Sequence, residues 1–422
     1  MNKIIFAIIF ALFTTIDSMF LANITKDDES SLIKAIERSK EMRGVIYINT
    51  PVININSTNT LLLNRNQIQI IGVIQANGDY PRINFKNARK NGSTANGITM
   101  AGNNFYLNFL IIENAGGNGI YITGANNVLK NIITRYNNGS GFLLSGLNAG
   151  ANKLTNCYSY RNVNIREYGG NASGFSQLLG SSFTIFENCF AWDNSDNGFD
   201  LFDKEGKGTS GAIISNSGSW NNGNADVFTG KYDYDNNRPL DKNLWTIQEL
   251  IATDPNFESN YINKKFSITN GKMGNIDAIS WYSKGVEKMQ GIGFNLGSNI
   301  NSKIEVLRRI VESVSFDHKS VGFLSNTREP VYTVLIHNLV SFNNDINYQL
   351  PYNFQVWENN WSWNPKTNHQ NKQNSPLYPV DKNKATEAFY SIRDQIVKNC
   401  EANYFDDNVS FVGTINNILN NL

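Results

Sequence analysis

Five segments of the chain carry the same polar pattern, an asparagine followed six residues later by a second asparagine. Apolar residues alternate around the first asparagine of each pair, as in NVLKNIITRYNN, and this alternation predicts short strands that end in turns. Similar segments that recur along a chain indicate a stacked repeat. An asparagine amide both donates and accepts hydrogen bonds, so a column of stacked asparagines satisfies itself. The pattern therefore predicts a parallel β-helix with Asn131, Asn156, Asn188 and Asn216 stacked in one interior column.

The second asparagines of these pairs lie in a shared frame as well. They are Asn137, Asn162, Asn194, Asn222 and Asn344. Asn344 belongs to the fifth pair, whose first asparagine is Asn338. A separate repeated phrase contains glycine and reads NGITMAG, NGIYITG, SGFLLSG, ASGFSQLLG and NGFDLF. Its glycines, at positions 97, 119, 141, 174 and 198, are separated by 22, 22, 33 and 24 residues. One coil therefore takes about 22 residues, and the long step predicts an inserted loop near 160–171. We expect each glycine to supply a corner conformation that other residues resist.

The rest of the chain predicts the domain organisation. Lys3 and the apolar run 4–13 predict a signal peptide at 1–18, because ten apolar residues are too few to span a bilayer. The segment 27–40 predicts an amphipathic helix that caps the open end of the solenoid. We expect a β-helix domain at 27–348, an irregular insertion within it at 225–290 (with a helix at 243–254), and a C-terminal tail at 349–422 that packs on the solenoid, with a helix at 384–399.

Charge and cysteine content limit the partners. With 37 basic and 36 acidic residues the formal net charge is +1, so no overall field attracts nucleic acid or a membrane. After removal of the signal peptide we expect a secreted, extracellular monomer without a membrane segment. Cys157 and Cys189 each follow a ladder asparagine and should stack on neighbouring rungs, either as free thiols or as a disulfide.

Acidic residues gather in the segment 192–208, WDNSDNGFDLFDKEGKG. In a β-helix this segment is a turn followed by a strand, so Asp196 and Asp200 flank one corner. Two carboxylates and the amide oxygen of Asn197 suit a hard cation such as Ca²⁺. A hydrated acidic loop without a ligand has the same spacing, so both interpretations stay open on spacing alone.

These motifs resemble those of the pectate lyases of polysaccharide lyase family 9. NSDNGFDLF (194–202) is similar to the family signature N-[AS]-D-D-G-W-D-L, and GGNASGF (169–175) resembles its N-A-D-G-F segment. Similarity to the rungs that follow continues in the same order through GAIISNSGSWNNG (211–223), GIGFNLGS (291–298), 308–323 and 332–348. The likeness covers roughly residues 29–348. It implies an all-β fold, a single-stranded right-handed parallel β-helix of the pectin-lyase-like type, with an N-terminal capping helix and a C-terminal tail.

The resemblance also implies a site. In the family four aspartates bind Ca²⁺ and a lysine removes the C5 proton of a galacturonate unit, so that the polysaccharide is broken by β-elimination. In this chain the calcium positions are Asp196, Asp200, Asn197 and Ser173, and the lysine position is Asn295. Two carboxylates bind Ca²⁺ only weakly, and an asparagine amide is no base near neutral pH.

Two functions follow from these motifs. The first is a secreted, pectate lyase-like protein that acts on or binds an acidic polysaccharide such as pectate, by β-elimination with Ca²⁺ if it is active; the asparagine at the lysine position leaves catalysis open. The alternative is a non-catalytic polysaccharide-binding or adhesin-like surface protein, because a β-helix does not guarantee a lyase. Candidate substitute bases are Lys204, Lys207, Lys284 and Lys288, while Arg308, Arg309, His318 and His337 lie on the following rungs. A hydrolase that uses Asp196 and Asp200 as its acid and base is a further alternative.

Overall fold

The computed structural model describes residues 20–39, 43–65, 67–146, 149–164, 167, 169–178, 183–201, 211–224, 227, 268–269, 272–273, 289–297, 306–325, 332–350, 356–367, 376–404, 411 and 415. The predicted signal peptide and the helix predicted at 243–254 lie outside these residues. So do the four lysines named as substitute bases.

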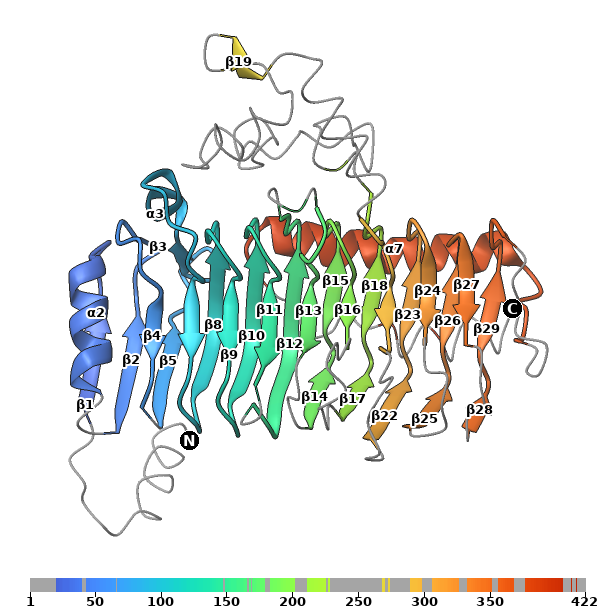
Figure 1. Cartoon of the computed structure of the whole chain (residues 1–422), viewed down its shortest axis with the longest axis horizontal. Coiled ribbons are helices and arrows are strands. Elements are labelled where there is room, and N and C mark those ends of the chain that lie inside the picture. Colours follow the sequence, from blue (N-terminus) through green and yellow to red (C-terminus); the bar gives the residue numbers. More distant parts are fainter. Residues whose placement is uncertain are drawn as a thin grey trace.

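Two long parallel sheets wind around one axis and form an elongated solenoid (Figure 1). The larger sheet has eighteen strands: β1 (Phe20–Ile24), β2 (Gly44–Ile48), β3 (Val52–Asn54), β5 (Ile68–Gly72), β6 (Arg82–Asn84), β8 (Tyr106–Glu113), β10 (Val128–Arg135), β12 (Asn152–Tyr160), β14 (Thr184–Glu187), β15 (Phe190–Trp192), β17 (Ala212–Ser215), β18 (Gly218–Trp220), β22 (Val306–Val311), β23 (Val314–Phe316), β25 (Tyr332–His337), β26 (Val340–Phe342), β28 (Val356–Glu358) and β29 (Trp361–Trp363). The smaller sheet has nine: β4 (Leu61–Leu63), β7 (Ile98–Met100), β9 (Ile120–Ile122), β11 (Phe142–Ser145), β13 (Phe175–Leu178), β16 (Phe199–Asp200), β21 (Phe294–Asn295), β24 (Val321–Leu324) and β27 (Ile346–Gln349). The predicted all-β parallel β-helix is therefore confirmed.

Helices and one small hairpin complete the described structure. β19 (Ile268–Thr269) and β20 (Lys272–Met273) form an antiparallel pair. α2 (Glu29–Arg38) begins at Asp28, whose side chain accepts the backbone N–H groups of Ser30 and Ser31, as expected of an N-cap. The helix lies at the N-terminal end of the solenoid, beside β1, as predicted (Figure 1). The remaining helices are α3 (Lys86–Lys90) and α7 (Lys382–Glu401).

The first asparagine of each pair stands at a bend within the larger sheet. Asn131 donates to Asn108, Asn156 to Asn131 and Asn188 to Asn156, with amide-to-amide distances of 2.8–3.0 Å. Each first asparagine has a positive φ of 51–55°, a conformation that asparagine tolerates better than most residues do. The predicted column thus exists, but its predicted burial is wrong. Asn156, Asn188 and Asn216 are only half-buried, and no amide hydrogen bond joins Asn216 to Asn188.

The fully buried column is made by the second asparagine of each pair. Asn137 donates to Asn162, Asn162 to Asn194, and Asn194 to Asn222, at 2.9–3.0 Å, and all four side chains are completely buried. On the next coil His318 takes the asparagine position, where its Nδ1 accepts the backbone N–H of Asn222 at 3.2 Å. The amides of this column satisfy one another's hydrogen bonds, as expected of stacked asparagines. The buried column is made by the second asparagine of each pair, which lies six residues after the predicted one.

The repeated glycines stack beside this column. None of the five has a positive φ, so the predicted role as a special corner conformation is wrong. A Cβ atom on Gly119 would lie 2.7 Å from both the carbonyl oxygen of Gly141 and the Nδ2 atom of Asn137. Glycine is therefore required here because the backbone of one coil approaches the next coil and the asparagine column too closely for a side chain.

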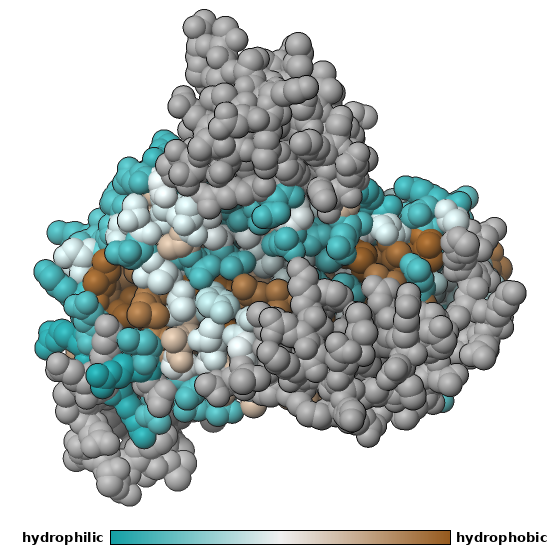
Figure 2. All heavy atoms as spheres, viewed as in Figure 1, coloured by the Kyte–Doolittle hydropathy of each residue, from teal (hydrophilic) through white to brown (hydrophobic). Residues whose placement is uncertain are grey.

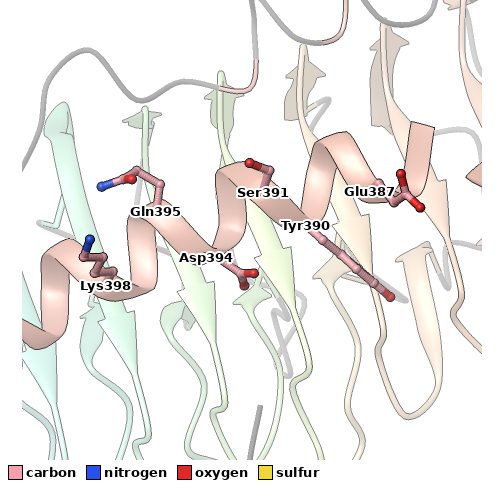
Figure 3. A pocket seen from close by; sticks show the side chains of 6 residues that line it. All are labelled: Glu387, Tyr390, Ser391, Asp394, Gln395 and Lys398. Atoms are coloured by element: carbon pink, nitrogen blue, oxygen red, sulfur yellow. The ribbon is translucent and has the colours of Figure 1, made fainter. Parts of the chain in front are cut away.

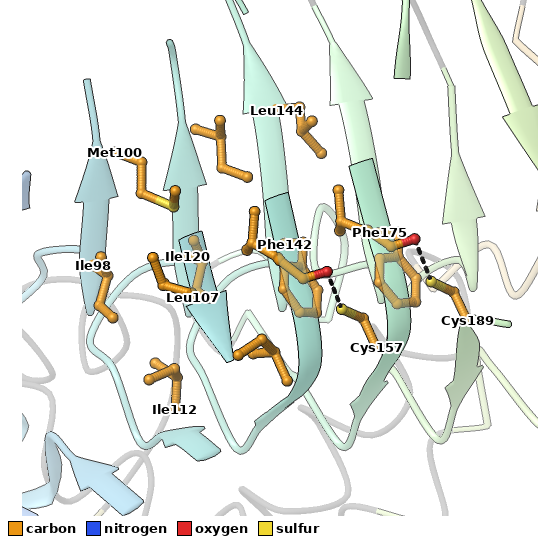
Figure 4. Packing of buried hydrophobic residues seen from close by; sticks show 14 of the residues in the cluster. Ile98, Met100, Leu107, Ile112, Ile120, Phe142, Leu144, Cys157, Phe175 and Cys189 are labelled. Carbon is orange, nitrogen blue, oxygen red and sulfur yellow. Dashed lines mark hydrogen bonds between the residues drawn. The ribbon is translucent and has the colours of Figure 1, made fainter. Parts of the chain in front are cut away.

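Inside the solenoid, like residues stack on like. Phe142, Phe175, Phe199, Phe294 and Phe323 form one continuous stack with ring centroids 4.7–4.9 Å apart. Stacked pairs of this kind contribute about 0.5–1.5 kcal/mol each beyond the area that they bury. Cys157 and Cys189 lie on neighbouring coils close to this stack (Figure 4). Both are free thiols, and each donates to a backbone carbonyl of the preceding coil at 3.5 Å.

A second aromatic stack lies outside the larger sheet and is covered by α7. Its members are Tyr160, Trp192, Trp220, Phe316, Phe342 and Trp363, with centroids 4.4–5.7 Å apart. Phe389 of α7 packs on Phe342 and Trp363. α7 thus runs along the flank of the coils (Figure 1).

On the face seen in Figure 2, hydrophobic residues form separate patches within largely hydrophilic surroundings. Within the described residues, no helix has the length and apolar character needed to span a bilayer.

Candidate functional site

The predicted acidic turn lies at the entrance to a strand of the smaller sheet. Phe199 of β16 points into the interior stack, so its neighbour Asp200 faces outward. Asn295 of β21 is the direct parallel partner of Asp200, and its Nδ2 atom donates to Oδ1 of Asp200 at 2.9 Å. The backbone N–H of Gly297 in turn donates to Oδ1 of Asn295 at 3.0 Å. Two of the predicted site residues are therefore in direct contact.

Asp196 has a different environment, because its carboxylate is buried between the loops of neighbouring coils. It accepts the backbone N–H of Asn171 at 3.0 Å and that of Gln290 at 3.2 Å. Burial raises the pKa of Asp196 to about 7, and the charge of Asp200 adds to the rise, while the two backbone hydrogen bonds and Lys319 oppose it. The carboxylate therefore joins the inserted loop of one coil to the chain that returns from the long insertion.

The other two predicted ligand positions, Asn197 and Ser173, differ in how their oxygens are used. Oδ1 of Asn197 accepts the backbone N–H of Ile292 at 3.0 Å, so this oxygen joins adjacent coils. Ser173 is buried, and its hydroxyl oxygen has no hydrogen-bond partner in the described structure. Only this hydroxyl is uncommitted, and it is neutral.

This donor set is a poor fit for the calcium ion that the resemblance implies. A Ca²⁺ site needs six to eight oxygen ligands, with carboxylates among them for tight binding. Here the two carboxylates and the amide already accept hydrogen bonds from protein N–H groups. Among the described residues no group of three or more His, Cys, Asp or Glu side chains is arranged to hold a metal.

Sequence reasoning missed Lys319. Its side chain is half-buried, and its Nζ atom donates to the carbonyl oxygen of Met289, next to the loop that Asp196 holds. Burial lowers the pKa of Lys319, although the carboxylate of Asp196 opposes this change. The segment 308–323, which contains Lys319, was aligned with the rungs, but no residue pattern in it indicates that this side chain approaches Met289 and Asp196.

The other basic residues named from the sequence differ in burial and in their contacts. Arg308 is buried and donates to the carbonyl oxygen of Leu296. Arg309 is exposed and lies 3.4 Å from the ring of His337, measured between nitrogen atoms. Burial lowers the pKa of His318 to about 3, so this ring in the asparagine column is neutral at ordinary pH.

The candidate site is the centre of a continuous row of residues on the outer face of the smaller sheet, which we call the outer row. Ser176, Asn295 and Leu324 in this row are buried, and the other six residues are at least partly exposed. Strand pairing brings one residue from each of the nine strands into register: Leu62, Thr99, Tyr121, Leu143, Ser176, Asp200, Asn295, Leu324 and Gln349. Rungs of a parallel sheet are about 4.8 Å apart, so the row extends for roughly 40 Å. Its length and regular spacing suit an extended polymer.

A pocket elsewhere is separate from this row. It has a volume of about 500 Å³, and six side chains of α7 line it: Glu387, Tyr390, Ser391, Asp394, Gln395 and Lys398 (Figure 3). None of them belongs to the candidate site. Tyr390 instead donates to Asp317 at 2.9 Å and so ties α7 to the larger sheet.

Comparison with known proteins places this geometry in a family. Residues 17–237, just over half of the chain, match the family described as "Pel9A-like, right handed beta helix region". Pectate lyase L of Dickeya chrysanthemi is 29% identical over 199 residues, which are 47% of this chain and 32% of that protein. Pectate lyase L of Dickeya dadantii (strain 3937) is 29% identical over 206 residues, 48% of this chain and 33% of that protein. The chain thus spans about a third of the length of the curated relatives that it matches.

The fold agrees with a solved structure. The crystal structure of pectate lyase Pel9A has a TM-score of 0.53 to this chain, with 20% identity, and covers 82% of this chain and 74% of its own. Identity this low speaks for the fold alone, but the family match covers the acidic turn as well. The solenoid is therefore right-handed, and the chain belongs to the Pel9A-like right-handed β-helix family.

Proposed function

We propose that the protein is a secreted, pectate lyase-like protein that binds an acidic polysaccharide of the galacturonan type along the outer row. The observation that supports this proposal is the row itself, which is nine rungs long, with the half-buried Asp200 and the buried Asn295 at its polar centre. Carbohydrate hydroxyl groups are good partners for such carboxylate and amide groups, and flanking apolar side chains suit the C–H faces of sugars.

Efficient β-elimination is not part of the proposal. The reaction needs a base that removes the C5 proton, and the amide of Asn295 cannot accept a proton near neutral pH. Its amide nitrogen is also bound to Asp200, which holds the side chain in place. Loss of a positioned base typically costs about 10²–10⁴-fold in rate. We therefore expect little or no eliminase activity, with binding retained.

We also propose that Ca²⁺ binds this site only weakly. Asp196 and Asp200 supply two carboxylates, and their oxygens already accept N–H groups. Sites with few charges bind Ca²⁺ with dissociation constants toward about 10⁻⁴–10⁻³ M. Calorimetric titration of the intact protein should find no submicromolar calcium site.

The test measures binding and elimination separately. Calorimetry with galacturonan oligomers should detect binding, and absorbance of the unsaturated uronate product should stay at background with and without Ca²⁺. Asp200→Ala should weaken binding of a methyl-esterified oligomer, whose hydroxyl groups can donate to the carboxylate without repulsion between charges. The matched control is Glu187→Ala, because Glu187 also carries a carboxylate, faces outward on the larger sheet and forms an ion pair with Lys153.

Absence of binding to every galacturonan by the folded protein would refute the proposed function. Robust Ca²⁺-dependent formation of unsaturated product would show instead that another base acts here. Lys319 would then be the first residue to replace, ahead of the four lysines outside the described residues.

A further inference from the structure

We propose that the outer row selects galacturonan whose carboxyl groups are esterified, and that the uncharged units lie over the apolar rungs between Leu62 and Leu143. This inference rests on the proposed function and names the chemical form of its ligand. It follows from which residues the nine strands present outward, and from how the oxygens of the acidic turn are used.

The N-terminal half of the outer row is apolar and accessible. Leu62 is 41% exposed, and Tyr121 and Leu143 are half-buried, although all three face away from the core. Strand pairing places Tyr121 between Thr99 and Leu143 on the same face. The tyrosine ring and the neighbouring Leu143 side chain offer apolar area, which favours the C–H face of a pyranose ring or an ester methyl group.

Charge on the outer row points the same way. Asp200 is the single charged side chain among its nine residues, and it is an acid. A free carboxylate on a bound sugar would be repelled by Asp200 and would meet no lysine or arginine in this row. The outward face of the larger sheet differs, because it carries Lys130, Lys153 and Arg309. Lys153 already pairs with Glu187 on that face, but Lys130 and Arg309 offer a polyanion positive charge that the nine residues of the outer row do not.

The acidic turn also offers few available oxygen ligands for a bridging cation. A free uronate can bind an acidic site through Ca²⁺, but the oxygens of Asp196 and Asn197 already accept backbone N–H groups. An esterified unit carries no charge and needs no cation. Selection of esterified galacturonan therefore explains both the poor fit of the acidic turn to calcium and the lack of basic residues in the outer row.

The experiment uses galacturonan oligomers of one length with none, about half or nearly all of their carboxyl groups methyl-esterified. Calorimetry should show that affinity for the wild-type protein rises with esterification, with little dependence on salt. Tyr121→Ala should weaken binding of the esterified oligomer by about 3- to 10-fold, the contribution of one stacked ring, and Tyr121→Phe should retain it. Tyr47→Ala is the matched control, because Tyr47 is a half-buried tyrosine on β2 of the larger sheet.

Leu143→Lys is the second variant, since it adds a cation to the outer row. It should strengthen binding of the unesterified oligomer and weaken binding of the esterified one. Tightest binding of the unesterified oligomer by the wild type, lost in high salt, would overturn the inference and leave the proposed function standing. Failure of the folded protein to bind any oligomer would refute both the inference and the proposed function.

Discussion

At the scale of single residues, one amide serves two tasks in this protein. The first asparagine of each pair holds a left-handed bend, and the second forms the buried column, so the same residue type recurs for different reasons. His318 departs from this pattern by standing in the column with a completely buried ring. Its Nδ1 accepts one N–H group, and its Nε2 has no partner among the described residues.

The buried histidine predicts how stability depends on pH. The pKa of His318 falls from 6.5 to about 3 on folding, so the unfolded chain binds a proton that the folded protein excludes. Its contribution to stability is therefore complete above pH 6.5 and is lost as the pH falls toward 3. Below pH 6.5 the loss should be about 1.4 kcal/mol per pH unit.

His318→Asn places the residue type of the neighbouring coils in the column and should remove this dependence. Urea unfolding of both proteins at several values between pH 4 and 8 measures the difference. Parallel stability curves for the wild type and the variant would contradict a neutral buried histidine.

At the scale of elements, the strands and stacking could be predicted because their residues repeat in a fixed frame. Burial of the two asparagine columns could not be distinguished, since both positions hold the same residue between similar neighbours. The sequence also predicted α2 and α7 to within two residues at each end. It predicted a tail that packs on the solenoid but not the face that α7 covers, because no local pattern indicates which face a helix covers.

The first strand makes a prediction about processing. β1 begins at Phe20, pairs with β2 over five residues and buries Ile24, so a cut within it would remove part of the sheet. Mass spectrometry of the mature protein should find its N-terminus at or before Phe20, close to the predicted end of the signal peptide at residue 18.

Truncation tests the same strand directly. A variant that begins at Phe20 should unfold like the mature protein, and one that begins at Thr25 should lose at least about 2 kcal/mol from the burial of Ile24. Equal stability of the two variants would mean that β1 contributes nothing to the end of the solenoid.

At the scale of the whole molecule, the fold does not depend on the residues of the candidate site. Contact between Asp200 and Asn295 could be predicted from the resemblance, because motifs preserve register. The position of Lys319 close to the loop at Asp196 could not be predicted, although its rung was identified, because no motif marks which side chains of neighbouring turns approach each other. The hydrogen bonds that Asp196 and Asn197 accept could not be predicted either. They are donated by backbone N–H groups, and no residue pattern indicates where those groups lie. The coils stack equally well whether or not the outward residues can bind a metal.

The triple variant Ser173→Asp, Asn197→Asp and Asn295→Lys tests this independence. It places three more charged groups beside Asp196 and Asp200, at positions that are buried in the wild type. Without Ca²⁺ the crowded carboxylates should repel one another and lower the thermal midpoint relative to the wild type. Addition of Ca²⁺ should raise the midpoint of the variant and leave the wild type nearly unchanged, because a ligand stabilises only the protein that binds it. Eliminase activity should rise far more than the sum of the three single changes, since groups that act as a unit are strongly non-additive. A wild-type midpoint that rises with Ca²⁺ as much as that of the variant would show that the protein already holds a calcium site, with ligands outside the described residues.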